Sequence, residues 1–251
     1  MSEKTVTRGI VLRETQTKEA DKILTVLTAE RGRIAVIARG ARRKNSPLAA
    51  ASELLAFSEL VLYEQRGWLM LSEGSTIELW GNIRRDVELL ALASYFAEMT
   101  EAVTGEGEPA GEVLALLLNT LYALDTLKKP LELVKAAFEL KLLSLAGYEP
   151  LVAECSVCGA AAPKEPLFDA AQGVVFCREC AGAAARGLLP LDPGSLAAFR
   201  HVLGAERKRM LSFGLNGETL TRFTRACEIF ARVQLERDFR TLDFYKNLCE
   251  P

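Results

Sequence analysis

The first third of the chain alternates apolar and polar residues in short stretches. Such alternation is typical of half-buried strands when β-branched and aromatic residues carry it. Turn signals, among them Arg31-Gly32 and Arg66-Gly67, separate the stretches. Five strands are predicted: Val6–Leu12, Ile23–Thr28, Arg33–Arg39, Leu54–Tyr63 and Trp68–Ile77. Five short strands at this spacing favour a small closed barrel, because closure leaves no unpaired strand edge.

From about Asn82 the apolar period changes from two to 3.6, which predicts helices. In the first of them Ile83, Val87, Leu90 and Ser94 lie near one apolar stripe, and four further residues widen it: Leu89, Leu92, Ala93 and Phe96. The polar segment 104–111 then interrupts the pattern. Four further helices are predicted: Val113–Leu127, Leu131–Ala146, Ser195–Leu211 and Glu218–Asp238.

Two of these helices have clear end signals. Gly147 follows the Leu131–Ala146 helix at the position where glycine commonly ends a helix. Asp192-Pro193-Gly194 is a start signal for the next helix. In the helix over 218–238 a buried face is expected from one set of side chains: Leu220, Phe223, Cys227, Phe230 and Ala231.

Residues 151–185 lack periodicity and hold four of the six cysteines. The expected fold is therefore α+β: an N-terminal β-barrel, then an α-helical domain into which a four-cysteine module is inserted. The expected boundaries are residues 1–80 for the barrel, 81–150 and 186–251 for the two parts of the helical domain, and 151–185 for the module.

Two CxxC pairs give the strongest chemical signal. Cys155 and Cys158 are separated by eighteen residues from Cys177 and Cys180, a spacing within the range of zinc sites. Residues 168–176 predict a hairpin that returns the second pair to the first. Four thiolates leave no open coordination position, so a single structural Zn²⁺ is expected. Iron in the same ligands remains an alternative from spacing alone. A thioredoxin-like use is weaker, because no βαβ pattern precedes either pair.

Composition narrows the chemistry. With 49% apolar residues and 25% charged residues, the chain can bury a core. Its single histidine excludes multi-histidine metal sites and disfavours catalytic triads. No Walker A sequence exists, and Gly105–Gly111 has one residue too many for a dinucleotide fingerprint. We therefore expect that the protein has no catalytic residues and is not an enzyme. The charged N-terminal residues and the lack of a long apolar run indicate a soluble, intracellular protein that does not enter a membrane.

The net charge of −2 hides an uneven distribution. Residues 1–50 hold eleven Lys and Arg against five acidic residues. On the third predicted strand Arg33 and Arg39 share a face, and a loop with three consecutive cations, Arg42 to Lys44, follows. A basic strand face that continues into a basic loop can track a phosphate backbone. A solvated turn is the plain alternative.

Aromatic residues that could stack on bases are sparse in the predicted barrel. They are Phe57, Tyr63 and Trp68 at most. The sequence therefore favours nucleic-acid binding that depends on charge rather than on stacking.

Two segments resemble the bacterial RecO family of recombination mediators. One is Asp21–Lys44, and the other is Phe138–Pro150, which runs directly into Cys155-x-x-Cys158-Gly. The resemblance implies an N-terminal OB-fold, a helical domain and an inserted zinc module. It also implies binding of single- and double-stranded DNA, annealing of complementary strands, and help in loading RecA on DNA coated by single-strand-binding protein.

The resemblance further implies partners and contact residues. The partners are RecR, single-strand-binding protein and RecF, and the location is cytoplasmic, with the bacterial nucleoid. The matching basic segment supplies the expected DNA contacts: Arg31, Arg33, Arg39, Arg42, Arg43 and Lys44, with Lys22 and Arg8 as weaker candidates. For the acidic tail of single-strand-binding protein, the lysines near apolar helix faces are the candidates: Lys128, Lys129 and Lys135.

Two alternatives stay open. One is a zinc-stabilised adaptor that binds proteins through its cysteine module and acidic helices, without direct DNA binding. The other is a redox enzyme that uses iron in the four thiolates. Iron and colour would support the redox enzyme, and colourless stoichiometric zinc would reject it.

Overall fold

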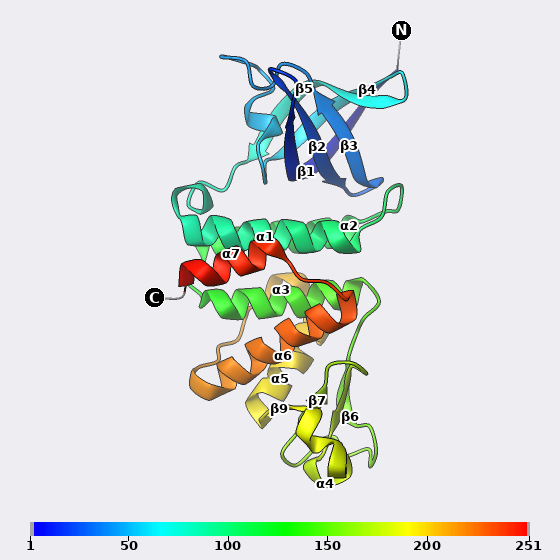
Figure 1. Cartoon of the computed structure of the whole chain (residues 1–251), viewed down its shortest axis with the longest axis vertical. Helices are drawn as coiled ribbons and strands as arrows, with labels where there is room; N and C mark the ends of the chain where they lie inside the picture. Colours follow the sequence, from blue (N-terminus) through cyan, green and yellow to red (C-terminus); the bar gives the residue numbers. More distant parts are fainter. Residues whose placement is uncertain (1–2, 250–251) are drawn as a thin grey trace. The chain divides into compact units, whose positions relative to one another are not determined.

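The computed structural model describes residues 3–249 and has the expected α+β composition (Figure 1). It contains two compact units. The first comprises the residues up to Leu127 and those from Phe239 onward, and the second comprises Lys128–Asp238. The chain thus leaves the first unit and returns to it near its end. The boundaries expected at residues 80, 150 and 185 stay predictions.

Five strands close into a barrel in the order β1-β2-β3-β5-β4, which confirms the expected OB-like barrel. The strands are β1 Lys4–Thr17, β2 Asp21–Thr28, β3 Gly32–Ala38, β4 Phe57–Gln65 and β5 Trp68–Glu78. All neighbours are antiparallel except β3 and β5. β1 closes the barrel because Lys4–Ile10 pairs with β4 while Gly9–Thr17 pairs with β2.

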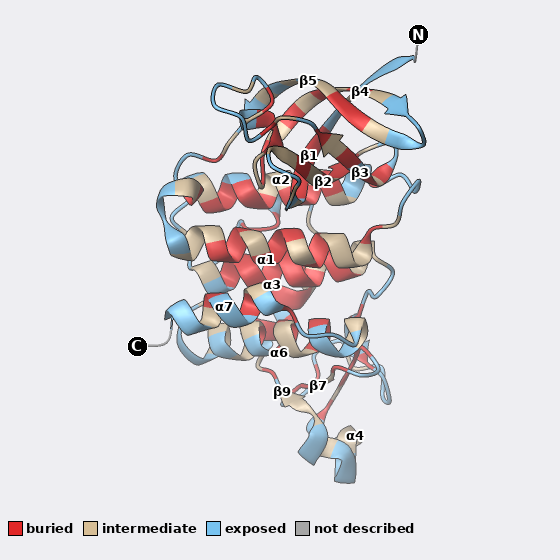
Figure 2. Ribbon diagram, turned by 45° about the horizontal axis from the view of Figure 1, so that its top comes forward, coloured by how far each residue is buried: buried red, intermediate tan, exposed pale blue. Residues whose placement is uncertain are grey.

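The alternation of β3 divides its residues as the sequence predicts. Ile34, Val36 and Ala38 are buried in the barrel interior. Arg33 and Ile37 are half-buried on the outer face. The interior is filled by apolar side chains from all five strands, which appear as buried segments in Figure 2.

Two strand boundaries differ from the prediction by three or more residues. β1 continues to Thr17 because a register shift between Val11 and Arg13, a β-bulge, bends the strand and lets its polar second half pair with β2. β4 begins only at Phe57, because Leu55 has a left-handed backbone (φ 63°) that ends the extended pattern. The buried Leu55 donates its N–H to the carbonyl oxygen of Val11, so this loop closes over the barrel.

Three helices complete the first unit: α1 Val87–Val103, α2 Gly111–Thr126 and α7 Arg240–Cys249. The carboxylate of Asp86 caps α1 by accepting hydrogen bonds from the N–H groups of Glu88 and Leu89. The predicted stripe of α1 is confirmed in part, because Leu92, Ala93 and Phe96 are buried. Val87, by contrast, is 59% exposed, and α1 begins there rather than near Asn82.

The helix α7 was not predicted from the sequence. This helix packs on α1, and the ring of Phe239 meets that of Tyr95 edge to face at 5.4 Å. The amide N–H of Thr241 donates to the carboxylate of Glu98 at 3.1 Å. A short polar helix of this kind gains its stability from the contact rather than from its own sequence.

The second unit contains the long helices α3 Leu131–Leu145, α5 Pro193–Gly204 and α6 Gly217–Leu235. Gly147 ends α3 as predicted: it has φ 92°, and Tyr148 N–H donates to the Leu143 carbonyl as in a Schellman motif. Asp192 and Ser195 form a capping box at the start of α5. This helix ends at Gly204 rather than Leu211, because the backbone becomes extended at Ala205.

The segment that holds the four cysteines forms a small sheet. Its order is β6-β8-β7-β9, from β6 Leu151–Cys155, β7 Leu167–Asp169, β8 Val174–Phe176 and β9 Leu189–Pro190, and the one-turn helix α4 Arg178–Ala181 follows β8. The predicted hairpin is confirmed by the antiparallel pairing of β7 with β8. Phe168 anchors the sheet, because its ring packs on Phe199 of α5 and Phe230 of α6.

Within residues 3–249, no helix is both long enough and apolar enough to cross a membrane.

Candidate metal centre and nucleic-acid interface

The small sheet brings the two CxxC pairs together. Cys155 is the last residue of β6, and Cys177 directly follows β8, the strand paired in parallel with β6. Cys158 and Cys180 lie one tight turn further along each segment. The first turn is closed by the Gly159 N–H, which donates to the Cys155 carbonyl at 2.9 Å, and by the positive φ of Gly159 (70°).

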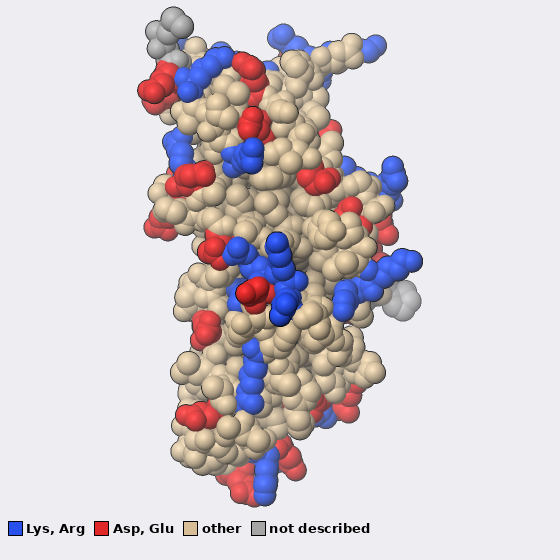
Figure 3. Space-filling view, turned by 180° about the vertical axis from the view of Figure 1, so that it is seen from behind, with Lys and Arg blue, Asp and Glu red and all other residues tan. Residues whose placement is uncertain are grey.

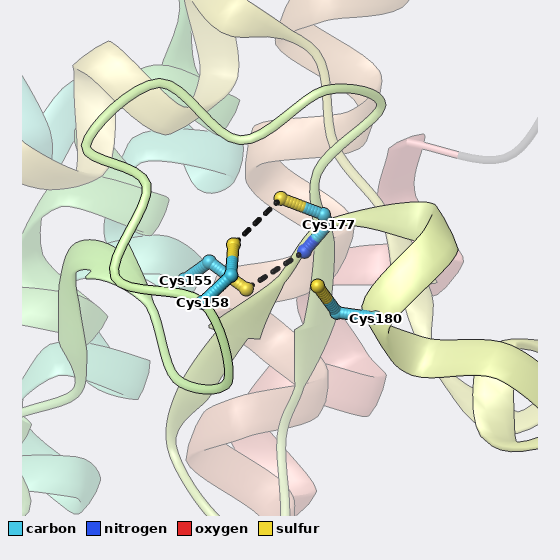
Figure 4. A group of neighbouring side chains, drawn as sticks. All are labelled: Cys155, Cys158, Cys177 and Cys180. Atoms are coloured by element: carbon cyan, nitrogen blue, oxygen red, sulfur yellow. Dashed lines mark hydrogen bonds between the residues drawn. The ribbon is translucent and has the colours of Figure 1, made fainter.

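The four sulfur atoms converge on one point (Figure 4). All lie within 4.8 Å of one another, and those of Cys158 and Cys177 are 3.7 Å apart. Tetrahedral coordination with metal–sulfur bonds of 2.3 Å requires sulfurs about 3.8 Å apart. The residues present therefore fit a metal ion held by four thiolates. Cys155 and Cys177 are buried and Cys158 is exposed, so the centre lies at the edge of the sheet.

Backbone N–H groups stabilise the thiolate form of Cys155. Burial alone raises the pKa of the Cys155 thiol, but N–H groups of Cys158, Cys177 and Val157 lower that pKa to about 6. One of these donors, Cys177 N, lies 3.2 Å from the Cys155 sulfur. By contrast, the neighbouring Cys158 sulfur raises the pKa of Cys180 to about 12. Four thiolates this close repel one another, and a divalent cation offsets that repulsion.

Sequence reasoning missed Arg200, which holds the first CxxC turn. From α5 its guanidinium donates to the carbonyl oxygens of Val152 at 2.7 Å and of Ala153 and Ala161 at 2.8 Å. These carbonyls belong to the segments immediately before and after the cysteine pair. Only the folded chain brings Arg200 to them, so no local pattern could have identified it.

The remaining two cysteines take no part in this centre. Cys227 is fully buried in α6, where burial raises the pKa of its thiol well above the usual value. Cys249 is exposed in α7, with its sulfur 3.3 Å from a carboxylate oxygen of Glu88. The prediction that Cys227 fills the core is confirmed.

Most of the predicted basic contacts lie on the surface of the barrel unit. Five side chains are exposed and form no ion pair with any residue from 3 to 249: Arg31, Arg39, Arg42, Arg43 and Lys44. The loop that carries three of them is ordered by backbone hydrogen bonds from Arg42 N–H to Ala20 and from Arg43 N–H to Gly40. The loop therefore presents fixed cations beside the end of β3.

Two other candidates, Arg33 and Lys22, are engaged within the fold. Arg33 donates to the Glu101 carbonyl at 3.0 Å and lies 3.8 Å from the Glu101 carboxylate. Lys22 is 9% exposed and binds Glu14 at 2.7 Å and the Ser52 carbonyl at 3.1 Å. These two side chains are held by structural contacts, so they offer less charge to a ligand than the five exposed cations.

Arg8 is exposed but lies 3.5 Å from the Glu59 carboxylate on the next strand. Lys135, a candidate for contact with an acidic peptide, is 5% exposed and pairs with Glu139 and Glu228 at 2.9 and 2.8 Å. Its ammonium is therefore not at the surface, contrary to expectation. Lys128 is exposed, and Lys129 donates to the Phe213 carbonyl at 3.1 Å.

Charged side chains are unevenly spread on the face in Figure 3. Most of that face is uncharged, and one compact group of basic side chains, with an acidic one among them, lies near the middle of the view. A net charge near zero thus coexists with local concentrations of one sign.

Comparison with known families decides the relationship. Residues 1–80 match the model described as Recombination protein O N terminal, and residues 84–243 match that described as Recombination protein O C terminal. The chain belongs to the RecO family. The resemblance of Asp21–Lys44 and Phe138–Pro150 to this family is thereby confirmed.

Curated RecO relatives align along nearly the whole chain. The DNA repair protein RecO of Acetivibrio thermocellus is 32% identical over 243 residues, which cover 96% of each chain. That of Symbiobacterium thermophilum is 31% identical over 243 residues, again 96% of each. That of a Roseiflexus species is 32% identical over 242 residues, 95% of this chain and 83% of the relative. The similarity therefore includes the barrel, the helices and the cysteine segment.

Proposed function

We propose that this RecO-family chain is a DNA-binding recombination mediator in DNA repair that works without catalysis. The observation that carries the proposal is a group of four exposed cations that form no ion pair with residues 3–249: Arg39 directly after β3, and Arg42, Arg43 and Lys44 in the loop that follows. The fifth exposed cation, Arg31, lies at the other end of β3. Cations fixed at one edge of a small barrel are suited to phosphate groups. The names of the relatives, DNA repair proteins, support the same role.

The chemistry of this role is electrostatic. Two complementary strands repel each other through their phosphates, and bound cations reduce that repulsion so that bases can pair. Annealing proceeds downhill once the strands are aligned, so it requires no nucleotide hydrolysis. Both single- and double-stranded DNA carry the phosphates that such a surface binds.

The family implies partners for this activity. We propose that the chain acts with RecR to load RecA on DNA coated by single-strand-binding protein, with RecF as a further partner, in the bacterial cytoplasm at the nucleoid. Family membership supports these partners, and no residue is assigned to them.

For the four cysteines we propose one structural Zn²⁺. The support is the thiolate donor set and sulfur spacing, which suit zinc and leave no free position for a substrate. When bound, the ion would fix the two CxxC turns to each other, while Phe168 holds the sheet against α5 and α6.

Charge reversal tests the DNA-binding proposal. In the variant Arg39→Glu, Arg42→Glu and Arg43→Glu, we expect weaker binding of an oligonucleotide and a salt slope reduced by about 2–3. The matched control reverses three other exposed arginines, Arg85, Arg186 and Arg225. Binding and salt slope measured by anisotropy should change only in the first variant. Equal affinity and slope in both variants would refute the proposal.

An adaptor role is the second candidate, favoured by two exposed apolar side chains on the cysteine segment. Leu151 is 71% exposed and Val157 is 64% exposed. Under this role the purified protein would not bind oligonucleotides, and the double variant Leu151→Ser, Val157→Ser would no longer bind a protein partner. Under the DNA-binding role the same variant keeps its oligonucleotide affinity.

A further inference from the structure

The β4–β5 hairpin ends in an exposed tryptophan on a rigid turn. Arg66 and Gly67 form a two-residue turn in which both residues have positive φ, 54° and 79°, and Gln65 pairs with Trp68 across it. This is the geometry of a type I′ turn, which fixes strand register tightly. Trp68 is 53% exposed, although a tryptophan is normally well buried in a folded domain.

The ring belongs to the outer face of the barrel. Its neighbour Leu69 packs against the barrel core and Leu71 is part of that core, so the alternation of β5 turns Trp68 and Met70 away from that core. Met70 is nevertheless only 2% exposed, so Trp68 is the open apolar side chain of the two. Met70 is the register partner of Ile37 on β3 and of Tyr63 on β4. A row of apolar side chains therefore crosses three strands beside the tryptophan.

The same face carries one cation of the proposed DNA surface, Arg39. Val36 pairs with Leu69, so Trp68 lies beside the exposed Ala35 on β3. Arg39, on the same face, is four residues further along, about 13 Å at the rise of a strand. Arg66 is exposed directly before the ring and forms no ion pair with any residue from 3 to 249.

The residue choice at the turn is informative. Type I′ turns favour asparagine or glycine at both central positions, because other side chains resist positive φ. Arg66 occupies the first position despite that conformational cost, and a Cβ at Gly67 would meet no atom of residues 3–249 within 4 Å apart from its chain neighbours. The turn thus presents a cation and an indole together at an open hairpin tip.

We propose that Trp68 is a base-stacking subsite for single-stranded nucleic acid, with Arg66 contacting an adjacent phosphate. The inference rests on the proposed function and deepens it: cations alone bind any phosphate backbone, whereas an indole face accepts only a base that has left its duplex stack. The subsite makes this barrel face prefer single strands over duplexes. It adds stacking to a surface whose sequence indicates charge alone.

The full-length protein allows a direct spectroscopic test, because it contains two tryptophans and the other, Trp80, is 5% exposed and donates to the Leu55 carbonyl. Saturating oligothymidylate should quench the Trp68 emission, and the Trp68→Phe variant should lose this quenching. An equally long oligomer of abasic deoxyribose phosphates should bind without quenching. Unchanged Trp68 emission at saturation would overturn the inference.

Affinity measurements give the second test. Trp68→Ala should weaken oligothymidylate binding roughly 5- to 100-fold and leave binding of the duplex and the abasic oligomer unchanged. Trp68→Phe should retain most of the affinity. The control Ile77→Ala, which truncates another exposed apolar residue of β5, should retain the full affinity. Arg66→Asn suits the turn and should lower the salt slope by about 0.7.

The outcomes separate the two proposals. If the parent binds oligothymidylate with a salt slope that depends on Arg39, Arg42 and Arg43, and Trp68→Ala binds identically, only the stacking subsite is refuted. The same holds if Trp68→Ala loses single strand and duplex equally, or loses a protein partner but no affinity for DNA. If the parent binds none of these oligomers, both proposals are wrong.

Discussion

The guanidinium of Arg200 donates a hydrogen bond of 2.8 Å to the carbonyl oxygen of Ala161, three residues beyond Cys158. The same group binds the carbonyl oxygens of Val152 and Ala153 on the strand that leads into Cys155. One side chain of α5 therefore joins both ends of the first cysteine turn, and the helix and the turn are expected to lose order together.

Replacing Arg200 should loosen the metal centre without removing a ligand. Arg200→Ala leaves three carbonyl groups without their donor, at a cost of about 1–3 kcal/mol in unfolding free energy. We also expect faster metal release to a chelator, because the support of the ligands is lost. A chromogenic chelator and urea denaturation measure the two effects. Arg225→Ala, an exposed arginine of α6, is the control; identical release rates in the two variants would contradict the prediction.

Replacing one ligand should remove the ion. In Cys177→Ser we expect loss of bound metal and a lower melting temperature, because the remaining thiolates hold the two turns together poorly. Cys249→Ser, at an exposed thiol outside the centre, should keep both. Elemental analysis and thermal melting provide the measurement, and colourless protein with one zinc per chain is expected of the parent. A Cys177→Ser protein that retains full metal and parental melting would be inconsistent with the site.

The Asp192 cap of α5 should make the unfolding free energy decrease as the pH falls into the acid range. Burial raises the pKa of Asp192, but hydrogen bonds from Ser195 and Thr219 and the charge of Arg222 lower it overall. A depressed folded-state pKa stabilises the protein fully above the unfolded value of about 3.9, and this stabilisation disappears as the pH falls through the folded value.

The variant Asp192→Asn keeps a capping side chain and removes the charge. It should be about 1 kcal/mol less stable than the parent near pH 7 and near pH 5, with a smaller difference near pH 3. Urea denaturation at the three pH values measures this difference. A difference that grows in acid would show that the sign is wrong.

The buried charges between α3 and α6 should be strongly coupled. Lys135 lies between Glu139, which is fully buried, and Glu228; burial lowers the pKa of Lys135, but the two carboxylates raise it overall. Lys135→Met removes the cation from this pair of carboxylates and should cost about 3–5 kcal/mol.

A second substitution tests the cause of this loss. Adding Glu139→Gln to Lys135→Met should recover part of the stability, because one buried charge is then removed. Urea denaturation of the single and double variants forms the cycle. Additive losses in the double variant would show that the charges are not coupled.

The barrel could be predicted from sequence because its information is local. Alternation over β3 places Ile34 and Val36 inside, and the Arg66-Gly67 turn fixes the β4–β5 register. The cysteine pairs are equally local, since each turn closes within a few residues and only the distance between pairs depends on the fold.

The remaining features depend on contacts between distant residues. The bulge in β1 and the left-handed Leu55 arise where the strands must bend to close. The polar helix α7 exists because α1 offers it a surface. The sequence shows that a side chain is charged but not whether the folded chain already binds that charge. Lys22 binds a buried carbonyl and Lys135 a buried carboxylate, whereas Arg39 is exposed and open to a ligand.

The return of the chain to its first unit has a consequence for synthesis. The second unit is continuous, from Lys128 to Asp238, and all its residues have left the ribosome tunnel before the first unit can be completed. Until the segment from Phe239 onward emerges, Tyr95 lacks its edge-to-face contact with Phe239, and α1 lacks its contact with α7. The first unit begins the chain, yet its last helix is synthesised after the whole second unit.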